Sequence, residues 1–190
     1  MEEIVERRLR LNVEPKHGLL DKLDMDAYLR FDLSGIVVDH KCYMEERFQN
    51  RLRFSFAHEV GHFVLHKGIY DRLNISTPQE WKDLVLNESN QEYRSFEWQA
   101  NEFAGRLLVP QQELVREIEE VHEVIEKTGM LQYLKDDPGA VLSRVSPRLC
   151  RPFGVSEIVV ETRVQREKLW PPDQKASQTG RTSEPGVYAS

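Results

Sequence analysis

In one segment about a third of the way along the chain, apolar residues fall on every side of the predicted helix, whereas most other segments divide into an apolar and a polar face. From Phe54 to Leu65 there is no Lys, Arg, Asp, Asn or Gln, and apolar residues fall on every side of a helix built from this segment. We therefore predict that Asn50–His66 is a buried helix, ended by Lys67 and Gly68. A β-branched run after a turn signal predicts a strand at Gly35–Asp39.

Other segments repeat apolar residues every three to four positions and predict amphipathic helices. These helices are Leu19–Arg30, Phe96–Val109, Gln111–Lys127, Ala140–Arg151 and Ser156–Leu169. The last two are joined by a turn that contains Gly154, an arrangement similar to a helix-turn-helix. Because Glu157 and Glu161 at the start of the second helix oppose phosphate binding, we favour packing against the rest of the protein over DNA contact.

The motif His58-Glu59-Val60-Gly61-His62 lies inside the buried helix. Residues four apart share one helix face, so two imidazoles can hold one metal ion while Glu59 stands beside the water that the ion binds. A zinc ion lowers the pKa of its bound water to about 7, and a carboxylate can take the proton. The alternative is a pair of core histidines bonded to neighbours. We prefer the metal site, since unpaired buried charges are costly.

A catalytic zinc site needs a third protein ligand. His66 lies about 12 Å beyond His58 along a helix, too far to share one ion, so we expect His66 to cap the helix end or to form a hydrogen bond near the site. Glu97 borders the apolar stripe of the predicted helix Phe96–Val109 and is the better ligand. Glu102 lies on the opposite, solvated face, where it can pair with a nearby arginine, Arg106.

Asn101 follows Glu97 by one helical turn. Its amide can orient a metal ligand through a hydrogen bond to the side of the ligand that faces away from the ion. It can equally be an amide that packs between helices. The spacing leaves these two roles open.

The segments Arg53–His66 and Glu97–Pro110 together resemble the ImmA/IrrE family of zinc metallopeptidases, and the resemblance covers about residues 19–110. Members of that family are intracellular gluzincin-type proteases that cleave helix-turn-helix repressors. The resemblance implies an α+β, zincin-like fold with a central metal helix, a small sheet and a helical C-terminal lobe. It also implies one zinc ion per chain, or another divalent ion, with Glu59 as the catalytic base and with three ligands, His58, His62 and Glu97.

Composition and charge are consistent with one catalytic unit and a tail. The chain has 190 residues, 39% of them hydrophobic, and its net charge of −6 disfavours direct nucleic-acid binding. Cys42 and Cys150 form no metal-binding pattern, and no signal peptide or membrane-length apolar run is visible, so we expect a cytoplasmic protein with no membrane contact. We divide it into an N-terminal extension (1–18), a catalytic core (19–110), a helical lobe (111–170) and a disordered tail (171–190).

We expect a zinc endopeptidase that cleaves a protein substrate, and the resemblance implies that this substrate is a helix-turn-helix repressor. The alternative is a non-hydrolytic regulatory module that binds metal or a repressor without cutting it; the presence of Glu59 favours the enzyme. The strand Gly35–Asp39 is the candidate for binding substrate backbone. The insertion Asn74–Phe96 either grips the substrate or is a passive surface loop. Three residues are candidates to stabilise the oxyanion, Tyr43, His66 and Tyr93.

Overall fold

The computed structural model describes residues 1–70, 72, 77–80, 83 and 91–172, with residues 91–93 described for their backbone alone. Most of the predicted tail, 171–190, and the middle of the predicted insertion lie outside these ranges. The C-terminal end of that insertion is helical, because the helix that carries Glu97 begins at Gln91.

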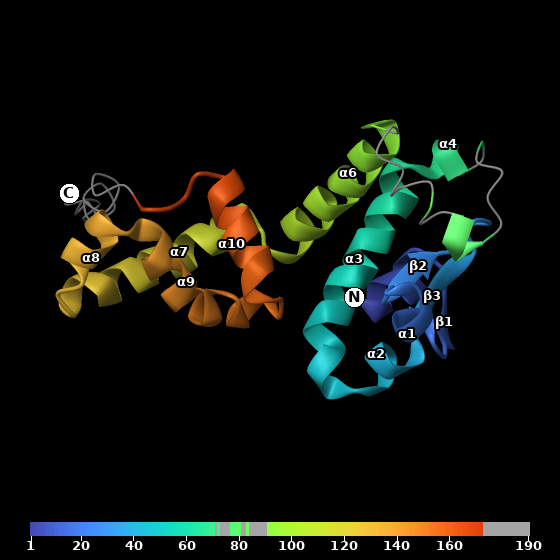
Figure 1. The fold of residues 1–190 in the computed structure, drawn as a ribbon, viewed down its shortest axis with the longest axis horizontal. Coiled ribbons are helices and arrows are strands. Elements are labelled where there is room, and N and C mark those ends of the chain that lie inside the picture. The colour runs from blue at the N-terminus through green and yellow to red at the C-terminus, as the bar shows by residue number, and fades with distance from the viewer. Residues whose placement is uncertain (71, 73–76, 81–82, 84–90, 173–190) are drawn as a thin grey trace, which may run out of the picture.

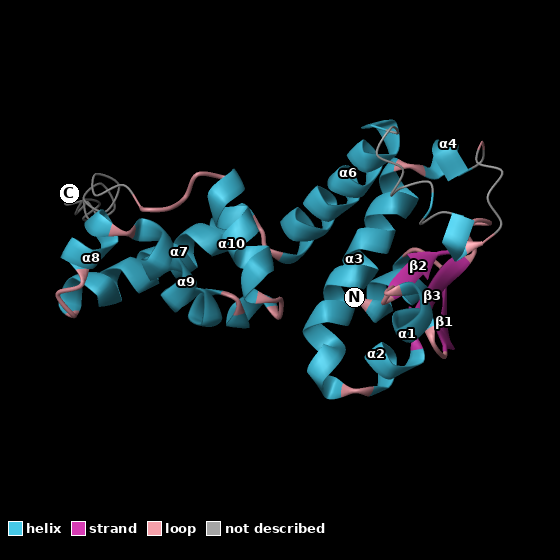
Figure 2. Ribbon diagram, in the orientation of Figure 1, coloured by secondary structure: helices cyan, strands magenta, loops and turns pink. Residues whose placement is uncertain are grey.

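A three-stranded sheet lies at one end of the molecule, with strand order β1-β3-β2 (Figures 1 and 2). β1 (Asn12–Lys16) pairs parallel with β3 (Gly35–Asp39), and β2 (Ala27–Leu29) pairs antiparallel with β3. All five residues of β3 are buried, as a central strand requires. The predicted strand is confirmed. The sheet also takes in Asn12–Lys16, from the region that we treated as an N-terminal extension.

The predicted helix Leu19–Arg30 is wrong in its second half. The helix α1 covers only Leu19–Leu23, and Asp24 ends it in a left-handed conformation with φ of 53°. The chain then forms β2, with Ala27 and Leu29 buried and Tyr28 partly buried. Apolar residues at these positions fit a helix face as well as a strand face. The pairing of β2 with β3, a contact between distant residues, decides between them.

The central helix α3 (Gln49–Leu65) packs along α6 (Gln91–Leu108), and β2 lies against α3 on the other side (Figure 1). The two helices approach closely at Gly61, where an added Cβ would stand 3.2 Å from the Cα and the carbonyl oxygen of Ala100. Short elements flank α3: α2 (His40–Met44), a helical turn at Glu46–Phe48 and α4 (Lys67–Tyr70). A further helical turn, Ile4–Arg8, precedes β1.

The C-terminal residues form a helical lobe at the other end of the molecule (Figure 1). It contains α7 (Gln111–Lys127), α8 (Leu131–Asp136), α9 (Pro138–Leu149), a helical turn at Arg151–Phe153 and α10 (Glu157–Arg166). The apolar stripe predicted for α7 is buried in the core of this lobe, at Leu114, Ile118, Val121 and Ile125. The structure thus confirms an α+β fold with a small sheet and a helical lobe. Among the described residues, every helix is too short or too polar to cross a bilayer.

The last helix, α10, packs against α9 and α6, as the sequence favoured. Ion pairs join α6 to the end of α10: Arg166 with Glu102, and Arg106 with Glu167 at 3.0 Å. Glu102 also pairs with Arg106 as predicted, at 3.5 Å, but its side chain is only 12% exposed. Its predicted solvated position is therefore wrong, because α10 folds back over this face of α6.

Candidate metal centre

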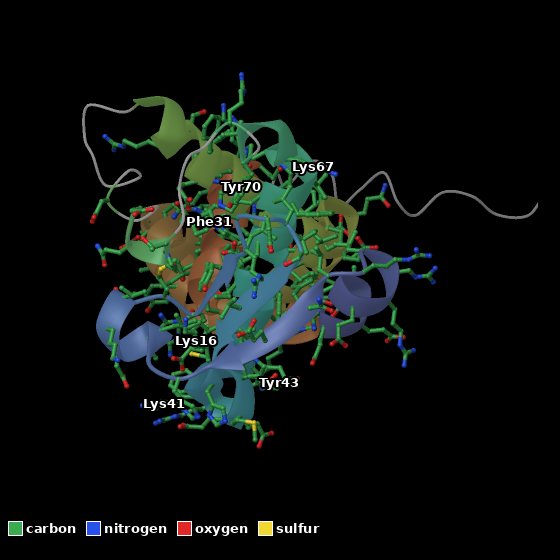
Figure 3. All side chains as sticks on the ribbon, turned by 90° about the vertical axis from the view of Figure 1, so that its right-hand side faces the viewer. Lys16, Phe31, Lys41, Tyr43, Lys67 and Tyr70 are labelled. Atoms are coloured by element: carbon green, nitrogen blue, oxygen red, sulfur yellow. The ribbon has the colours of Figure 1, made fainter. Side chains whose placement is uncertain are left out.

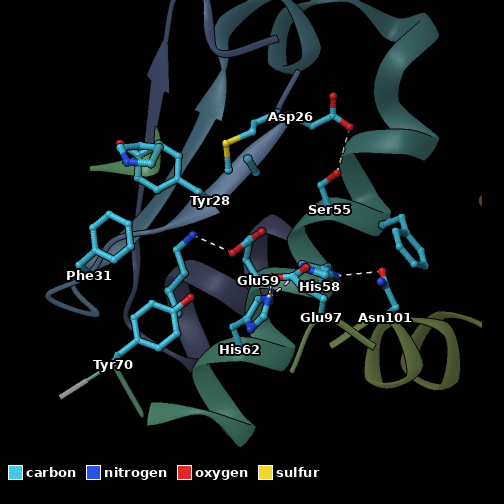
Figure 4. Close-up of a pocket in the computed structure, with 15 residues that line it drawn as sticks. Asp26, Tyr28, Phe31, Ser55, His58, Glu59, His62, Tyr70, Glu97 and Asn101 are labelled. Atoms are coloured by element: carbon cyan, nitrogen blue, oxygen red, sulfur yellow. Dashed lines mark hydrogen bonds and ion pairs between the residues drawn. The ribbon is translucent and has the colours of Figure 1, made fainter. Parts of the chain in front are cut away.

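The side chains of His58, His62 and Glu97 converge between α3 and α6 (Figure 4). The two imidazole Nε2 atoms are 3.0 Å apart. Glu97 Oε2 lies 3.2 Å from His58 Nε2, and Glu97 Oε1 lies 3.2 Å from His62 Nε2. The helical spacing of the two histidines and the close approach at Gly61 bring these three groups together, as the sequence predicted.

The spacing of these atoms fits a bound metal ion. Ligands held about 2.0–2.1 Å from a tetrahedral zinc ion stand roughly 3.3 Å from one another, close to the distances observed here. Glu97 Oε1 is buried and accepts no hydrogen bond, an arrangement that is costly unless a cation is nearby. These three residues can therefore hold a metal ion.

Asn101 orients the first of these histidines. Its Oδ1 lies 3.0 Å from Nδ1 of His58. Because an amide oxygen only accepts hydrogen bonds, Nδ1 carries a proton, and Nε2 is the nitrogen that faces His62 and Glu97. Of the two roles left open for Asn101, the structure shows the orienting one.

A chain of hydrogen bonds orients His62 in the same way. His62 Nδ1 lies 3.0 Å from Nδ1 of His66, and His66 Nε2 lies 3.3 Å from Oε1 of Gln99. The Gln99 oxygen accepts, so His66 carries its proton on Nε2 and accepts at Nδ1 from His62. The Gln99 amide in turn donates to Ser95 Oγ at 3.1 Å. His66 is also the C-cap residue of α3, so both predicted roles of His66 are confirmed.

Glu59 lies beside the cluster and is buried, with 7% of its surface exposed. Its Oε2 accepts a hydrogen bond of 2.7 Å from the backbone N–H of Leu29 in β2. Burial, with the negative charge of Glu97, raises the pKa of Glu59 to about 7, while the charge on His58 and the Leu29 N–H oppose the shift. A carboxyl group with a pKa near neutrality can both take and return a proton.

The pKa of Glu97 is shifted in the opposite direction, below its usual value. Burial alone would raise its pKa, but the imidazoles of His58 and His62 hold the pKa well below its usual range. Glu97 is therefore an anion at neutral pH, as a metal-ligating carboxylate must be.

A cleft of about 250 Å³ opens onto these residues, and β2 forms one wall of it. Asp26 and Arg30 flank β2, and their backbones bond to Asp39 and Gly35 of β3. In an antiparallel pair only every second residue bonds to the partner strand. The backbone groups of Ala27 and Leu29 therefore point away from β3. The prediction that Gly35–Asp39 binds substrate backbone is wrong, since β1 and β2 already pair with both edges of that strand.

Two of the three predicted oxyanion candidates, Tyr43 and His66, lie outside the cleft. Tyr43 donates a hydrogen bond to Glu2 near the opposite end of the sheet (Figure 3). His66 lies behind His62 rather than in the cleft, and the side chain of Tyr93 is outside the described part of the chain. The structure instead places Tyr70 in the cleft wall, buried, with its ring centre 6.3 Å from that of His62. No local pattern in the sequence identified Tyr70, because the fold of the chain after α3 places it there.

Comparison with known proteins agrees with this geometry. The family model of the IrrE N-terminal-like domain, Peptidase_M78, matches residues 45–165, a range that includes the metal-ligand helices and the helical lobe almost to the end of α10. No curated protein and no solved structure matches the chain. The chain belongs to the M78 family of metallopeptidases, which the IrrE N-terminal-like domain defines, as its two motif segments predicted.

Proposed function

We propose that the protein is a zinc-dependent endopeptidase in which His58, His62 and Glu97 hold the ion and Glu59 is the general base. The observation that carries this proposal is the convergence of three ligating groups, all within 4.8 Å of one another, beside a buried carboxyl group in the same cleft. Two imidazoles with one carboxylate form the ligand set of many catalytic zinc sites, which favours zinc over other divalent ions.

The residues of the chain divide the reaction between them. When bound, zinc supplies Lewis acidity for the scissile carbonyl and lowers the pKa of water. Glu59 takes a proton from the attacking water and later passes it to the leaving amine. Asn101 and His66 keep the two histidines in the tautomer that ligation requires. The phenol of Tyr70 lines the cleft and is our candidate to donate a hydrogen bond to the developing oxyanion.

The substrate lies along β2 in this proposal. The outward backbone groups of Ala27 and Leu29 can pair with an extended peptide, which is how sheet edges bind polypeptide. The Leu29 N–H now bonds to Glu59. A substrate that takes over this N–H therefore also frees the carboxylate that must act as the base.

The substrate class rests on the family resemblance: a helix-turn-helix repressor. The test is to incubate the zinc-loaded protein with a helix-turn-helix repressor encoded next to it and, separately, with casein, and to map the products by mass spectrometry. We expect cleavage of the repressor at one site, casein left largely intact, and neither product with Glu59→Gln. Digestion of casein at many sites with the repressor untouched would refute the regulatory substrate but keep the peptidase. No zinc-dependent cleavage of either protein would refute the proposed activity.

A further inference from the structure

A second hollow lies beside the cleft, between α3, α6 and α10. We call it the α10 groove; its volume is about 520 Å³, roughly twice that of the cleft. Gly105 of α6 allows α10 to approach, because a Cβ there would stand 3.0 Å from Cδ of Arg163. The groove is therefore built by the packing of the helical lobe onto the metal-ligand helix.

The α10 groove is continuous with the cleft. Both are lined by Asp26, Phe54, Ser55 and Asn101. In the close-up of the cleft, Asp26, Ser55 and Asn101 lie on one side of the three candidate ligands, and Tyr70 and Phe31 lie on the other (Figure 4). A chain that leaves the cleft past Ser55 and Asn101 thus enters the α10 groove directly.

The walls of the groove suit a polypeptide. Ile158 of α10 is 74% exposed, more than any other large apolar residue that the structure describes, and Phe54 and Val159 also line the groove. Uncharged polar side chains that can bond to a peptide backbone lie among them, at Asn50, Ser156 and Thr162.

Each charged side chain that lines the groove has a partner of opposite charge. Arg51 pairs with Asp26, and Arg166 pairs with Glu102. Arg163 is buried and bonded to Glu167 at 2.7 Å. Nucleic acid needs cations that are available to phosphate, so this surface favours a protein chain with an apolar side chain at the matching position.

We infer that the α10 groove binds the substrate polypeptide several residues from the scissile bond, on one side of it, and takes an apolar side chain against Ile158. This inference rests on the proposed peptidase function and extends it: residues of the helical lobe select which sequences the metal site cuts. The helix that resembled a DNA-reading element in the sequence becomes part of the substrate-binding surface.

The test is a cleavage profile of the zinc-loaded protein on a randomised twelve-residue peptide library, with products identified by mass spectrometry. Wild type should prefer an apolar residue at one position distant from the cut, on one side only. Ile158→Glu should lower kcat/KM for peptides with that apolar residue about tenfold or more, since burial of one side chain contributes this much. The Ile158→Glu variant should instead prefer peptides with a basic residue at that distant position. The preference next to the cut should stay unchanged.

Two controls isolate the groove. Val124→Glu changes another exposed apolar residue of the same lobe, 41% exposed on α7, and should leave the profile as in wild type. A randomised six-residue library, too short to fill both sites, should be cut equally by wild type and Ile158→Glu. A distant preference that survives in Ile158→Glu, or that wild type lacks, would overturn the inference alone. No cleavage of the twelve-residue library by wild type that still cuts the repressor would also overturn the inference alone. No cleavage of library, repressor or casein would overturn the proposed function, and the inference with it.

Discussion

His62 Nδ1 lies 3.0 Å from His66 Nδ1, so a histidine outside the metal-binding motif holds one member of the motif in place. Gln99 fixes the proton of His66 in turn. His62, one of the three proposed ligands, is therefore held in place by residues outside the proposed ligand set. Removal of such a supporting hydrogen bond typically weakens metal binding 10–100-fold.

The first prediction follows from this contact. His66→Phe, which keeps a ring but removes the acceptor, should weaken zinc affinity about 10–100-fold. His66→Gln, which keeps an acceptor, should lose less. Competition with a zinc chelator measures the affinity, and Leu65→Ala, at a neighbouring position that is 48% exposed, is the control. Equal zinc affinity in His66→Phe and wild type would show that the hydrogen bond between His62 and His66 does not contribute to zinc binding.

The second prediction separates the two carboxylates of α6. Glu97→Ala should lose most bound metal because it removes one of three ligands. Glu102→Ala should keep the metal, since Glu102 pairs with Arg106 and Arg166 instead. Metal content after dialysis, measured by mass spectrometry, decides between them. Loss of the ion in Glu102→Ala with retention in Glu97→Ala would reverse the assignment.

The third prediction concerns pH. Burial raises the pKa of Glu59 from its ordinary 4.5 to about 7. Between these pH values the folded, metal-free protein holds this proton more tightly than the unfolded chain does. The contribution of Glu59 to stability therefore falls as the pH rises through this range.

Glu59→Gln removes this dependence. In urea titrations of the metal-free proteins, the unfolding free energy of Glu59→Gln relative to wild type should rise between pH 5 and pH 8, by on the order of 1–3 kcal/mol. Glu119→Gln, at an exposed position on α7, should differ from wild type by the same amount at both pH values. If the difference in unfolding free energy between Glu59→Gln and wild type also stays constant with pH, burial does not raise the pKa of Glu59.

The fourth prediction tests the helix contact that brings the ligands together. Gly61→Ala places a Cβ 3.2 Å from backbone atoms of Ala100, which cannot move aside as a flexible side chain would. We expect a loss of about 1–3 kcal/mol of stability, together with weaker zinc binding. Gly68→Ala is the matched control, because nothing lies within 4 Å of its added Cβ. Thermal unfolding and chelator competition measure both effects. Equal behaviour of the two variants would contradict the close-packed arrangement.

The metal helix and its partner helix could be predicted from the sequence because their signals are local. Helical spacing alone places His58 and His62 on one face, and the apolar stripe of α6 ranks Glu97 above Glu102 as a ligand. The observed α3, Gln49–Leu65, differs from the predicted Asn50–His66 by one residue at each end.

Features that depend on distant contacts could not be predicted in this way. The segment Ala27–Leu29 is a strand only because β3 pairs with it, and it provides the edge beside Glu59. Tyr70 reaches the cleft only through the path of the chain after α3. Glu102 is covered only because α10, far along the chain, returns to α6.

The most direct test of the account is a comparison of Glu59→Gln with wild type in the same zinc-loaded state, with bound metal and cleavage rate measured on the same samples. We predict one zinc ion per chain in both proteins and a rate of repressor cleavage that falls about 10²–10⁴-fold in Glu59→Gln, because the variant keeps every ligand and loses only the general base. A variant that binds zinc and cleaves at the wild-type rate would contradict the assignment of Glu59, and with it the proposed mechanism.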